Sequence, residues 1–394
     1  MTRQLLAGPP VGAGPENLAQ HTARLGALPH VPGLITMLER AEVRGRGGAA
    51  FPTATKWRAV AQRSHGRAVV LANGAEGEPL SWKDRVLMES RPHLVLDGAA
   101  LAAQAVRASE VVLYVGGAHA AALVSVRAAL AERPQSEACR MRLVEAPDGY
   151  VSGEESAAVR FIDSGTALPT STPPRPFERG VGGRPTLVQN VETLATAALL
   201  ARGAAEASQL VTVAGAVRQP GVVEVTTAAT VGDAVSMAGG SAARAQAVLL
   251  GGYFGGWVGA ADAWGLPLDA AALRGRGLTL GCGVIAVLPD HRCGVAETAH
   301  IVRYLAGESA RQCGPCVFGL GAVAVALERV AECRPQFGEM PRLRRWTSQL
   351  AGRGACHHPD GAAGLIASAL GAFAAEFASH EAGWCAALSG RAAA

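Results

Sequence analysis

The sequence predicts an α/β fold for the first half of the chain, followed by a small β-rich module and a helical C-terminal region. Residues 31–200 alternate apolar runs with helix-like periodicity, which is typical of α/β proteins. Two β-type runs around residues 210–225 are joined by a turn containing Pro220 and Gly221, and helical periodicity dominates after residue 291. The length of 394 residues, of which 49% are hydrophobic, suits two or three domains with cores of their own.

Four segments follow from the pattern along the chain. Residues 1–30, rich in Gly, Pro and Ala, are expected to form a loose lead-in with one short helix. In residues 31–205, "GLITMLERAEV" predicts a helix, "AVVLANGAEGEP" a buried strand that opens into a loop, and "VVLYVGG" with "AHAAALVSVRAALAER" a strand, turn and helix. In residues 206–290, the hairpin is followed by one short helix, "TVGDAVSMAGG", and by the strands of "AQAVLLGGYFGGWVGA". In residues 291–394, "VFGLGAVAVALERVAE", "MPRLRRWTSQLAGRG" and "PDGAAGLIASALGAFAAEFASH" predict three amphipathic helices of a small bundle.

Charge and hydropathy exclude several classes of protein. The net charge of +4 is spread without runs of like charge, so nothing indicates a nucleic-acid-binding surface. The N-terminal residues lack the apolar run of a signal peptide. The most apolar stretch, "GLIASALGAFAAEFASH", contains Glu376 and is too short to span a bilayer. We therefore expect a cytoplasmic protein that is not transmembrane, although it could dock peripherally on a membrane complex.

The eight cysteines are not expected to form disulfides, because disulfides are rare in the cytoplasm. Three of them are isolated in the sequence and are expected in the core as small apolar residues: Cys139, Cys282 and Cys385. Four others group towards the C-terminus, which favours a cluster or metal site: Cys293, Cys313, Cys316 and Cys356.

Lysine is rare in this chain. Among 36 basic residues only Lys56 and Lys83 are lysines. A position that keeps lysine against this bias is expected to need a compact ammonium rather than the planar guanidinium of arginine. Chance survival of two lysines is the alternative.

The segment "RGRGGAAFPTATKW", residues 44–57, contains the spacing G-x-G-x-x-A of a dinucleotide-binding fingerprint. That fingerprint should follow a strand, but a predicted helix precedes it here, so an ordinary Rossmann loop is not expected. Successive glycines can still present backbone N–H groups to an anion. A simple turn between two helices is the alternative, but such a turn would not need Lys56 and Trp57 closely after it.

Two further segments are rich in polar side chains. "NGAEGEPLSWKDR", residues 73–85, follows a predicted strand, and loops at the carboxyl ends of strands are where α/β proteins place their sites. It gathers six polar or charged residues: Asn73, Glu76, Glu78, Lys83, Asp84 and Arg85. "GYVSGEESAAV", residues 149–159, puts two glutamates at the start of a helix, where acidic residues also occur for dipole reasons alone. A solvated polar loop and a structural helix start are the alternatives.

Together these motifs resemble the NADH-binding flavoprotein subunit of respiratory complex I and the related diaphorase subunits of NAD-linked hydrogenases and formate dehydrogenases. The family's glycine-rich loop with its Lys-Trp pair matches residues 45–57. Its Asn-x-x-Glu-x-Glu-Pro…Lys-Asp-Arg segment matches residues 73–85, and its Gly-Glu-Glu stretch matches residues 153–155. "PTLVQNVET", residues 185–193, matches a fourth family motif, and the resemblance extends in the same order over about residues 35–380.

The resemblance implies a Rossmann-like domain for FMN and NADH, a β-grasp domain of the soluble-ligand-binding type, and a helical domain with a 4Fe–4S cluster beside the flavin. The flavin would take a hydride from NADH and release electrons singly to the cluster. The residues implied to contact FMN or nucleotide are Gly45, Arg46, Gly47, Gly48, Phe51, Lys56, Asn73, Glu76, Gly153, Glu154, Asn190 and Thr193. Glu78, Glu155 and Phe177 are implied to face NADH, with the two glutamates as catalytic residues. For Phe51 a core position is the alternative.

The sequence departs from the family pattern in the flavin domain. The acidic residue two after the Asn is Ala75, the aromatic two after Lys-Trp is Ala59, the Lys before Pro-Pro-Phe is Pro174, and the Asn-Asn pair is Gln189-Asn190. Because Ala59 and Pro174 lie on the expected NADH side, we hypothesise weak nucleotide affinity or a different electron donor. Stopped-flow bleaching of the flavin at micromolar NADH would refute this hypothesis.

The family's cluster motif is incomplete in this chain. "ESARQCGPC" supplies Cys313 and Cys316, and Cys356 takes the position of the distant ligand, but Ala310 replaces the first cysteine and cannot bind iron. A closed zinc site is disfavoured because zinc also takes four ligands. Three outcomes stay open: a 4Fe–4S cluster with another fourth ligand, a three-cysteine site with a 3Fe–4S cluster or an open iron, or a flavoprotein without a cluster. Candidates for another fourth ligand are Cys293, His357 or another histidine.

Two functions are compatible with these residues. The first is an FMN-dependent NADH dehydrogenase subunit that passes electrons through FMN and an iron–sulfur cluster to a ferredoxin-like, thioredoxin-like or quinone-linked acceptor. The second is a non-catalytic flavin-binding or interaction module with a decayed NADH site. Retention of Glu78, Glu154 and Glu155 favours the enzyme, because unpaired charges in a buried cleft are costly.

Overall fold

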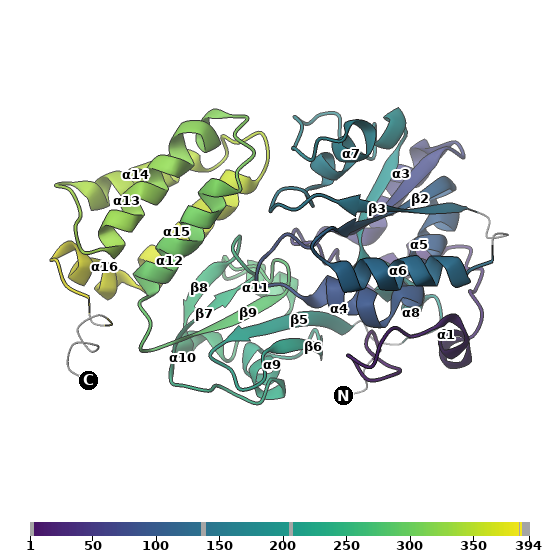
Figure 1. Ribbon diagram of the computed structural model, residues 1–394, viewed down its shortest axis with the longest axis horizontal. Helices are drawn as coiled ribbons and strands as arrows, with labels where there is room; N and C mark the ends of the chain where they lie inside the picture. Colours follow the sequence, from purple (N-terminus) through teal and green to yellow (C-terminus); the bar gives the residue numbers. More distant parts are fainter. Residues whose placement is uncertain (1–3, 135–138, 205–207, 386, 388–394) are drawn as a thin grey trace. The chain divides into compact units, whose positions relative to one another are not determined.

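The computed structural model divides into two compact units (Figure 1). The first comprises residues 1–211 and 224–227, and the second comprises residues 212–223 and 228–394. The residues described are 4–134, 139–204, 208–385 and 387. The composition of "LARGAAEASQ" also indicates a linker around residues 200–210, and residues 205–207 of it lie outside the described part of the chain.

A four-stranded sheet forms the centre of the first unit, with the strand order β3-β2-β1-β4. Its strands are β1 (Ala68–Gly74), β2 (Ala108–Gly116), β3 (Arg140–Ala146) and β4 (Thr186–Asn190). Every neighbouring pair in this order is parallel. Residues 68–72 of β1 are apolar and fully buried, as expected for a central strand covered on both faces. The predicted α/β class and the buried strand are confirmed.

Helices cover both faces of this sheet. They are α1 (Leu18–Leu25), α2 (Leu34–Arg40), α3 (Thr53–Ser64), α4 (Lys83–Ser90), α5 (Pro92–Val106), α6 (Ala120–Glu132), α7 (Glu155–Ser164) and α8 (Val191–Leu200). One face packs on α7, where Leu71 and Val112 belong to the same buried cluster as Ala158. On the other face, the buried Trp57 of α3 donates its indole N–H to Gln189 Oε1 of β4 at 3.1 Å.

The N-terminal segment is fixed in place, so the prediction of a loose lead-in is wrong, although its single short helix is present as α1. The Glu224 carboxylate accepts hydrogen bonds from the backbone N–H groups of Gln4, Leu5 and Leu6 at 2.8–3.0 Å. Leu5 and Leu6 are buried, and the Arg91 guanidinium donates to the Leu6 carbonyl at 3.0 Å. A carboxylate 220 residues further along the chain provides this anchor, and a Gly- and Pro-rich composition does not reveal it.

A five-stranded mixed sheet follows in the sequence, with the order β6-β5-β9-β7-β8. Its strands are β5 (Ser208–Gly215), β6 (Gly221–Thr226), β7 (Ala245–Leu250), β8 (Gly256–Gly259) and β9 (Val284–Pro289). β5 pairs in parallel with β9, whereas β7 is antiparallel to both β8 and β9. The predicted single helix is α9 (Val231–Met237), but α10 (Ala260–Ala263) and α11 (Ala270–Arg274) were not predicted. Four or five residues are too few to show helical periodicity.

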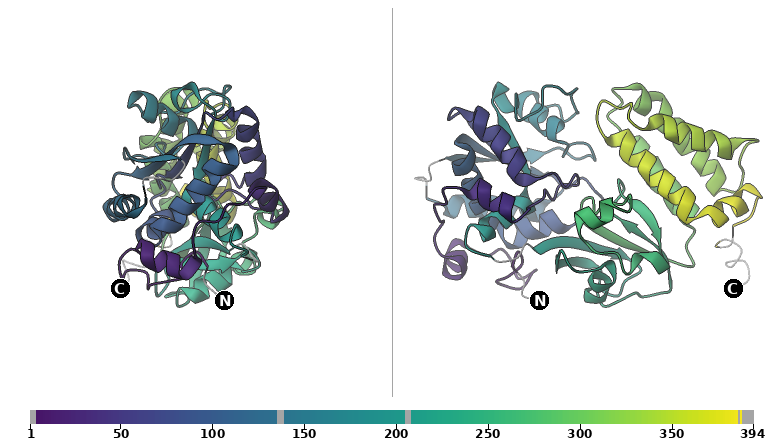
Figure 2. Two further views of the ribbon diagram at one scale, coloured as in Figure 1. Left: turned by 90° about the vertical axis from the view of Figure 1, so that its right-hand side faces the viewer. Right: turned by 180° about the vertical axis from the view of Figure 1, so that it is seen from behind.

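The C-terminal region is a set of packed helices, of which α12 to α15 lie alongside one another in Figures 1 and 2. They are α12 (Gly294–Gly307), α13 (Gly321–Ala331), α14 (Glu339–Leu350), α15 (His358–Ala372) and α16 (Ala374–Glu381). The third predicted helix is in fact two, because α15 and α16 meet at 85° around Phe373. Phe373 is buried with its ring centroid 5.3 Å from that of Trp257, and this contact fixes the break. Within the described residues, no single helix is long and apolar enough to cross a membrane, and only the bent α15–α16 pair reaches that length and composition.

Candidate functional site

The predicted flavin-site residues gather at the carboxyl edge of the parallel sheet. Asn73 near the end of β1 is directly paired in register with Asn190 at the end of β4. The Asn73 amide donates to the Gly153 carbonyl at 2.8 Å, which joins the loop before α7 to the same edge. The motifs at residues 73–85, 153–155 and 185–193 therefore meet in space. A position after a strand predicted this for residues 73–85, and the family resemblance implied it for the other two.

The glycine loop, residues 45–48, reaches this edge from between α2 and α3. Its backbone is closed by the Gly45 N–H, which donates to the Phe51 carbonyl at 2.9 Å. The Arg46 N–H donates to Thr193 Oγ1 at 2.9 Å, and this bond ties the loop to the start of α8. Gly48 has a φ of +113°, and a Cβ added there would meet no atom within 4 Å. The loop therefore presents open backbone in a conformation that favours glycine.

Three of the predicted flavin ligands are helix-capping residues in the structure. The Glu76 carboxylate accepts hydrogen bonds from two backbone N–H groups in the first turn of α4, that of Asp84 at 3.1 Å and that of Arg85 at 3.2 Å. Glu154 caps α7, and Asn190 caps α8 by accepting the Glu192 N–H at 3.0 Å. The N-termini of three helices thus point to one edge, but their first N–H groups already have acceptors. An anion bound here would depend on the glycine loop and on side-chain cations instead.

A charge network is buried beneath this edge. The Lys83 ammonium lies 2.7 Å from Asp84 Oδ1 and 2.8 Å from Glu192 Oε2, and it is almost completely buried. Burial alone would lower the pKa of Lys83, but the nearby carboxylates raise it above its usual value. Burial raises the pKa of Asp84 to about 7, with Glu76 and Glu192 adding to the effect and Lys83 opposing it. A single compact ammonium thus lies within ion-pair distance of two carboxylates. This agrees with the prediction that a position that keeps lysine needs a compact ammonium rather than a planar guanidinium.

The residues expected to face NADH differ in their burial and in the side chains that they contact. Glu78 is 8% exposed, and its carboxylate accepts a hydrogen bond from the Tyr150 hydroxyl at 3.0 Å. Glu155 forms an ion pair with Lys56 of α3, and both side chains remain partly exposed. The Phe51 ring is 52% exposed, so the alternative of a core position for it is wrong.

Phe177 lies near the other end of α3. The Arg63 guanidinium is 5.1 Å from the centre of its ring. Arg63 is two turns beyond Lys56, which corresponds to about 10 Å along the helix. The structure therefore brings Glu155 and Lys56 together and leaves Phe177 two turns away along α3.

His119, which the sequence motifs did not single out, lies directly after the carboxyl end of β2. Its Nδ1 is buried and has no hydrogen-bond partner within the described part of the chain. Burial lowers the pKa of His119, so the ring is neutral at pH 7. The signal that could have identified it is its place after a buried strand, in "VVLYVGGAHA". An unpaired buried nitrogen, an open glycine loop and nearby cations at one edge fit a phosphate-bearing flavin such as FMN.

Three cysteines gather in the second unit. Burial raises the pKa of the Cys316 thiol to about 11, and the neighbouring thiols of Cys313 and Cys356 contribute to this shift. The hydroxyl of Ser309, just after α12, also hydrogen-bonds Cys316. Three thiols at one place fit three ligands of an iron–sulfur cluster, while Ala310 offers no fourth.

Cys293 is not a fourth ligand of that site, contrary to one of the alternatives that the sequence left open. It caps the N-terminus of α12, whereas Ser309 and its partner Cys316 follow the C-terminus of the same 14-residue helix. The two ends are about 20 Å apart. Among the histidines, His357 is exposed and lies 3.2 Å from Asp360, and His358 is buried with Nε2 2.7 Å from the Leu305 carbonyl.

The three cysteines expected in the core differ in their burial. Cys139 and Cys282 are only half-buried. Cys385 is buried, so its predicted core position is confirmed, and it lies beside Cys293 and His380.

Comparison with known proteins agrees with this arrangement. Three family models match in order: the Nuo51 FMN-binding domain at residues 38–198, the SLBB domain at 210–252, and the NADH-ubiquinone oxidoreductase-F iron–sulfur binding region at 296–380. The F subunit of the NADH-quinone oxidoreductase of Salmonella typhimurium is 30% identical, over 87% of this chain and 83% of its own. The corresponding F 2 subunit of Rhizobium meliloti is 28% identical over 88% of both chains.

The structure also resembles a chain of an NAD⁺-reducing NiFe-hydrogenase, with a TM-score of 0.81 and 29% identity. The match covers 89% of this chain but only 62% of the longer hydrogenase chain. A flavin-binding α/β domain, an SLBB module and an iron–sulfur region in this order define a class of electron-transfer flavoprotein. Within that class, the chain belongs to the family of NADH-quinone oxidoreductase F subunits, the flavoprotein subunits of complex I, as the motifs predicted.

Proposed function

We propose that this chain is an FMN-dependent NADH dehydrogenase subunit that passes electrons from NADH to an iron–sulfur cluster. The observation that supports it most strongly is the convergence of four motifs at one sheet edge, beside an open glycine loop and a buried charge network. FMN, when bound, supplies the ability to accept a hydride and to release electrons one at a time. The protein supplies binding, orientation and electrostatics.

The glycine loop and its neighbouring cations would bind the flavin phosphate. The N–H groups of Gly45 and Arg46 already donate within the protein, so the backbone N–H groups of Gly47 and Gly48 and the charges of Arg46 and Lys56 form the proposed donor set. The amides of Asn73 and Asn190 each donate one N–H within the protein, to the Gly153 carbonyl and to Asp84, so each keeps a second N–H that can orient the flavin.

The nucleotide side of the site would use Glu78 and Glu155. The Tyr150 hydroxyl holds the Glu78 carboxylate in one orientation, and the Lys56 ammonium does the same for Glu155. Phe51, whose ring is exposed, offers a flat apolar surface on which a nucleotide base can stack.

Electrons would leave through the C-terminal region. Cys313, Cys316 and Cys356 are the proposed ligands of the cluster, and an iron–sulfur protein of ferredoxin or thioredoxin type is the proposed acceptor. We also propose a cytoplasmic location and the division of the chain at residues 30, 205 and 290. The ligand set and the acceptor follow the family resemblance, and the gathering of the three thiols supports the ligand set. The location and the boundaries follow from the composition and the pattern along the chain.

Steady-state reduction of ferricyanide by NADH tests the proposal on protein loaded with FMN. Turnover is expected, and Glu155→Gln should raise the KM for NADH about tenfold, the effect of one hydrogen bond to a charged group. Glu39→Gln is the matched control, because Glu39 is also paired with a basic side chain of α3, that of Arg58, but is exposed. FMN binding without NADH oxidation would support the non-catalytic module instead.

A further inference from the structure

A second group of metal-binding side chains lies at the opposite end of α12 from the three gathered cysteines. Cys293, His380 and Cys385 each place one ligand atom within 4.8 Å of the other two. All three are buried, with exposures of 9%, 1% and 5%. Cys293 precedes α12, His380 lies in α16 and Cys385 follows α16, so distant segments converge here.

The orientation of the His380 ring identifies its ligand atom. Nδ1 lies 2.9 Å from the Val330 carbonyl oxygen, so Nδ1 carries the proton and donates it. Nε2 is then unprotonated, and it lies 3.2 Å from Cys293 Sγ. A ring held through one nitrogen by a backbone carbonyl, with the other nitrogen presented to two thiols, is the usual arrangement of a metal-bound histidine.

We propose that Cys293, His380 and Cys385 bind one zinc ion through Sγ, Nε2 and Sγ. Zinc–sulfur bonds of about 2.3 Å and zinc–nitrogen bonds of about 2.0 Å give tetrahedral edges of about 3.5–3.8 Å. The observed Nε2–Sγ distance of 3.2 Å is close to the shorter of these edges, and all three ligand atoms lie within 4.8 Å of one another. Ligands of a polynuclear cluster stand further apart, because each thiolate binds a different iron atom. Two thiolates also neutralise the charge of Zn²⁺, which lowers the cost of burying it.

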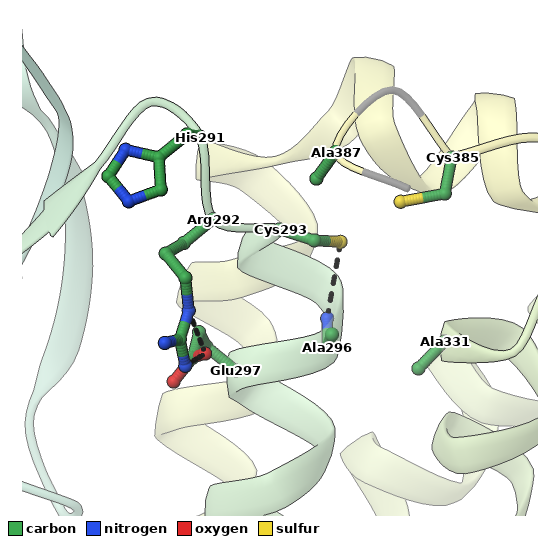
Figure 3. Close-up of a pocket in the computed structure, with 8 residues that line it drawn as sticks. All are labelled: His291, Arg292, Cys293, Ala296, Glu297, Ala331, Cys385 and Ala387. Carbon is green, nitrogen blue, oxygen red and sulfur yellow. Dashed lines mark hydrogen bonds and ion pairs between the residues drawn. The ribbon is translucent and has the colours of Figure 1, made fainter. Parts of the chain in front are cut away.

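The fourth position of the ion is open to a pocket. A pocket of about 340 Å³ is lined by Cys293 and Cys385 together with Glu297 and Ala331, and Figure 3 shows the two sulfur-bearing side chains facing it from opposite sides. The pocket provides an entry path for the ion and room for a water as fourth ligand. Cys333 Sγ lies 3.4 Å from Nδ1 of His380, on the side of the ring that faces Val330, and so is not one of the ligands.

The zinc site is independent of the proposed redox function. Its ligands lie about 20 Å along α12 from Ser309 and Cys316, and no flavin or cluster is needed to form it. Because the ion would join the segment before α12 to the end of α16, it would stabilise the helical region.

Metal analysis of the full-length protein, purified without a histidine tag and loaded with zinc chloride, tests the proposal. About one zinc ion per chain should remain after gel filtration, and Cys385→Ser and His380→Gln should lose it. Cys139→Ser and Cys333→Ser are the matched controls and should keep it. Wild-type protein without zinc, or Cys385→Ser with zinc retained, would overturn the assignment.

Two further measurements on the wild type apply if the variants do not fold. Cobalt added to metal-depleted protein should give the sulfur-to-cobalt charge-transfer bands of thiolate ligation, and zinc should raise the thermal unfolding midpoint. The absence of both effects contradicts the proposal. Iron in place of zinc, lost in Cys385→Ser but kept in Cys313→Ser, would also overturn it.

Discussion

Replacement of Lys83 by methionine tests the buried charge network of the first unit. In the wild type, the Lys83 ammonium lies within 2.8 Å of carboxylate oxygens on both Asp84 and Glu192, with no access to solvent. Methionine is similar in length but carries no charge, so in the variant Asp84 loses its cation and Glu192 keeps only the Arg46 guanidinium, whose Nε lies 3.9 Å from Glu192 Oε1. Removing one partner of a buried ion pair costs about 3–5 kcal/mol. For a unit of this size, that loss lowers Tm by about 6–20 °C.

The loss should also depend on pH. Lys83 holds the pKa of Asp84 down, so its removal raises that pKa further above about 7, whereas the unfolded value stays at 3.8. A carboxyl with a raised folded pKa stabilises the fold while it is protonated, and this stability is lost as the pH rises through the folded pKa. The deficit of the variant relative to wild type should therefore be larger at pH 8 than at pH 5.

Thermal unfolding of the flavin-free protein measures this effect without a contribution from ligand affinity. Lys56→Met is the matched control, because it removes the other lysine of the chain from a partly exposed ion pair that is worth about 0–1 kcal/mol. Equal losses of Tm in the two variants, or a deficit for Lys83→Met that does not change between pH 5 and pH 8, would refute the reasoning.

Three further predictions concern the nucleotide side, the N-terminal anchor and the cluster. Tyr150→Phe removes the hydroxyl that donates to Glu78 and should lower kcat/KM for NADH about tenfold without changing FMN affinity, which titration of flavin fluorescence checks. Glu224→Ala leaves backbone N–H groups of the N-terminal segment unpaired and should cost about 2–4 kcal/mol in urea unfolding, and an unchanged midpoint would show that the anchor is dispensable. Cys313→Ser should lower the iron content while Cys139→Ser does not, and equal iron in both variants would remove every cluster assignment that uses Cys313.

The position of the segment at residues 73–85 was predictable because it follows a strand, whereas the family resemblance supplied the other site motifs. Asn73 was expected in a loop at the carboxyl end of a strand, Asn190 was implied by the resemblance alone, and the structure pairs the two at the edge of the parallel sheet. Which groups each side chain contacts was harder to predict from the sequence. Glu154 appeared both as a flavin ligand and as an ordinary acidic residue at a helix start, and the structure shows the second role directly.

Contacts between distant segments account for what the sequence did not reveal. Cys293 and His380 are 87 residues apart, and only the packing of α12 against α16 brings them into contact. Cys385 was treated as an isolated core residue because no sequence spacing links it to Cys293. The break at Phe373 has the same origin, since a partner in β8, Trp257, fixes that ring.

The anaerobic visible spectrum of the purified protein, recorded before and after addition of NADH, tests the central claim most directly. We expect a flavin band with a broad iron–sulfur shoulder, both bleached by NADH. A flavin band that NADH leaves unchanged, without the shoulder, would contradict the proposed transfer of electrons from NADH through FMN to a cluster.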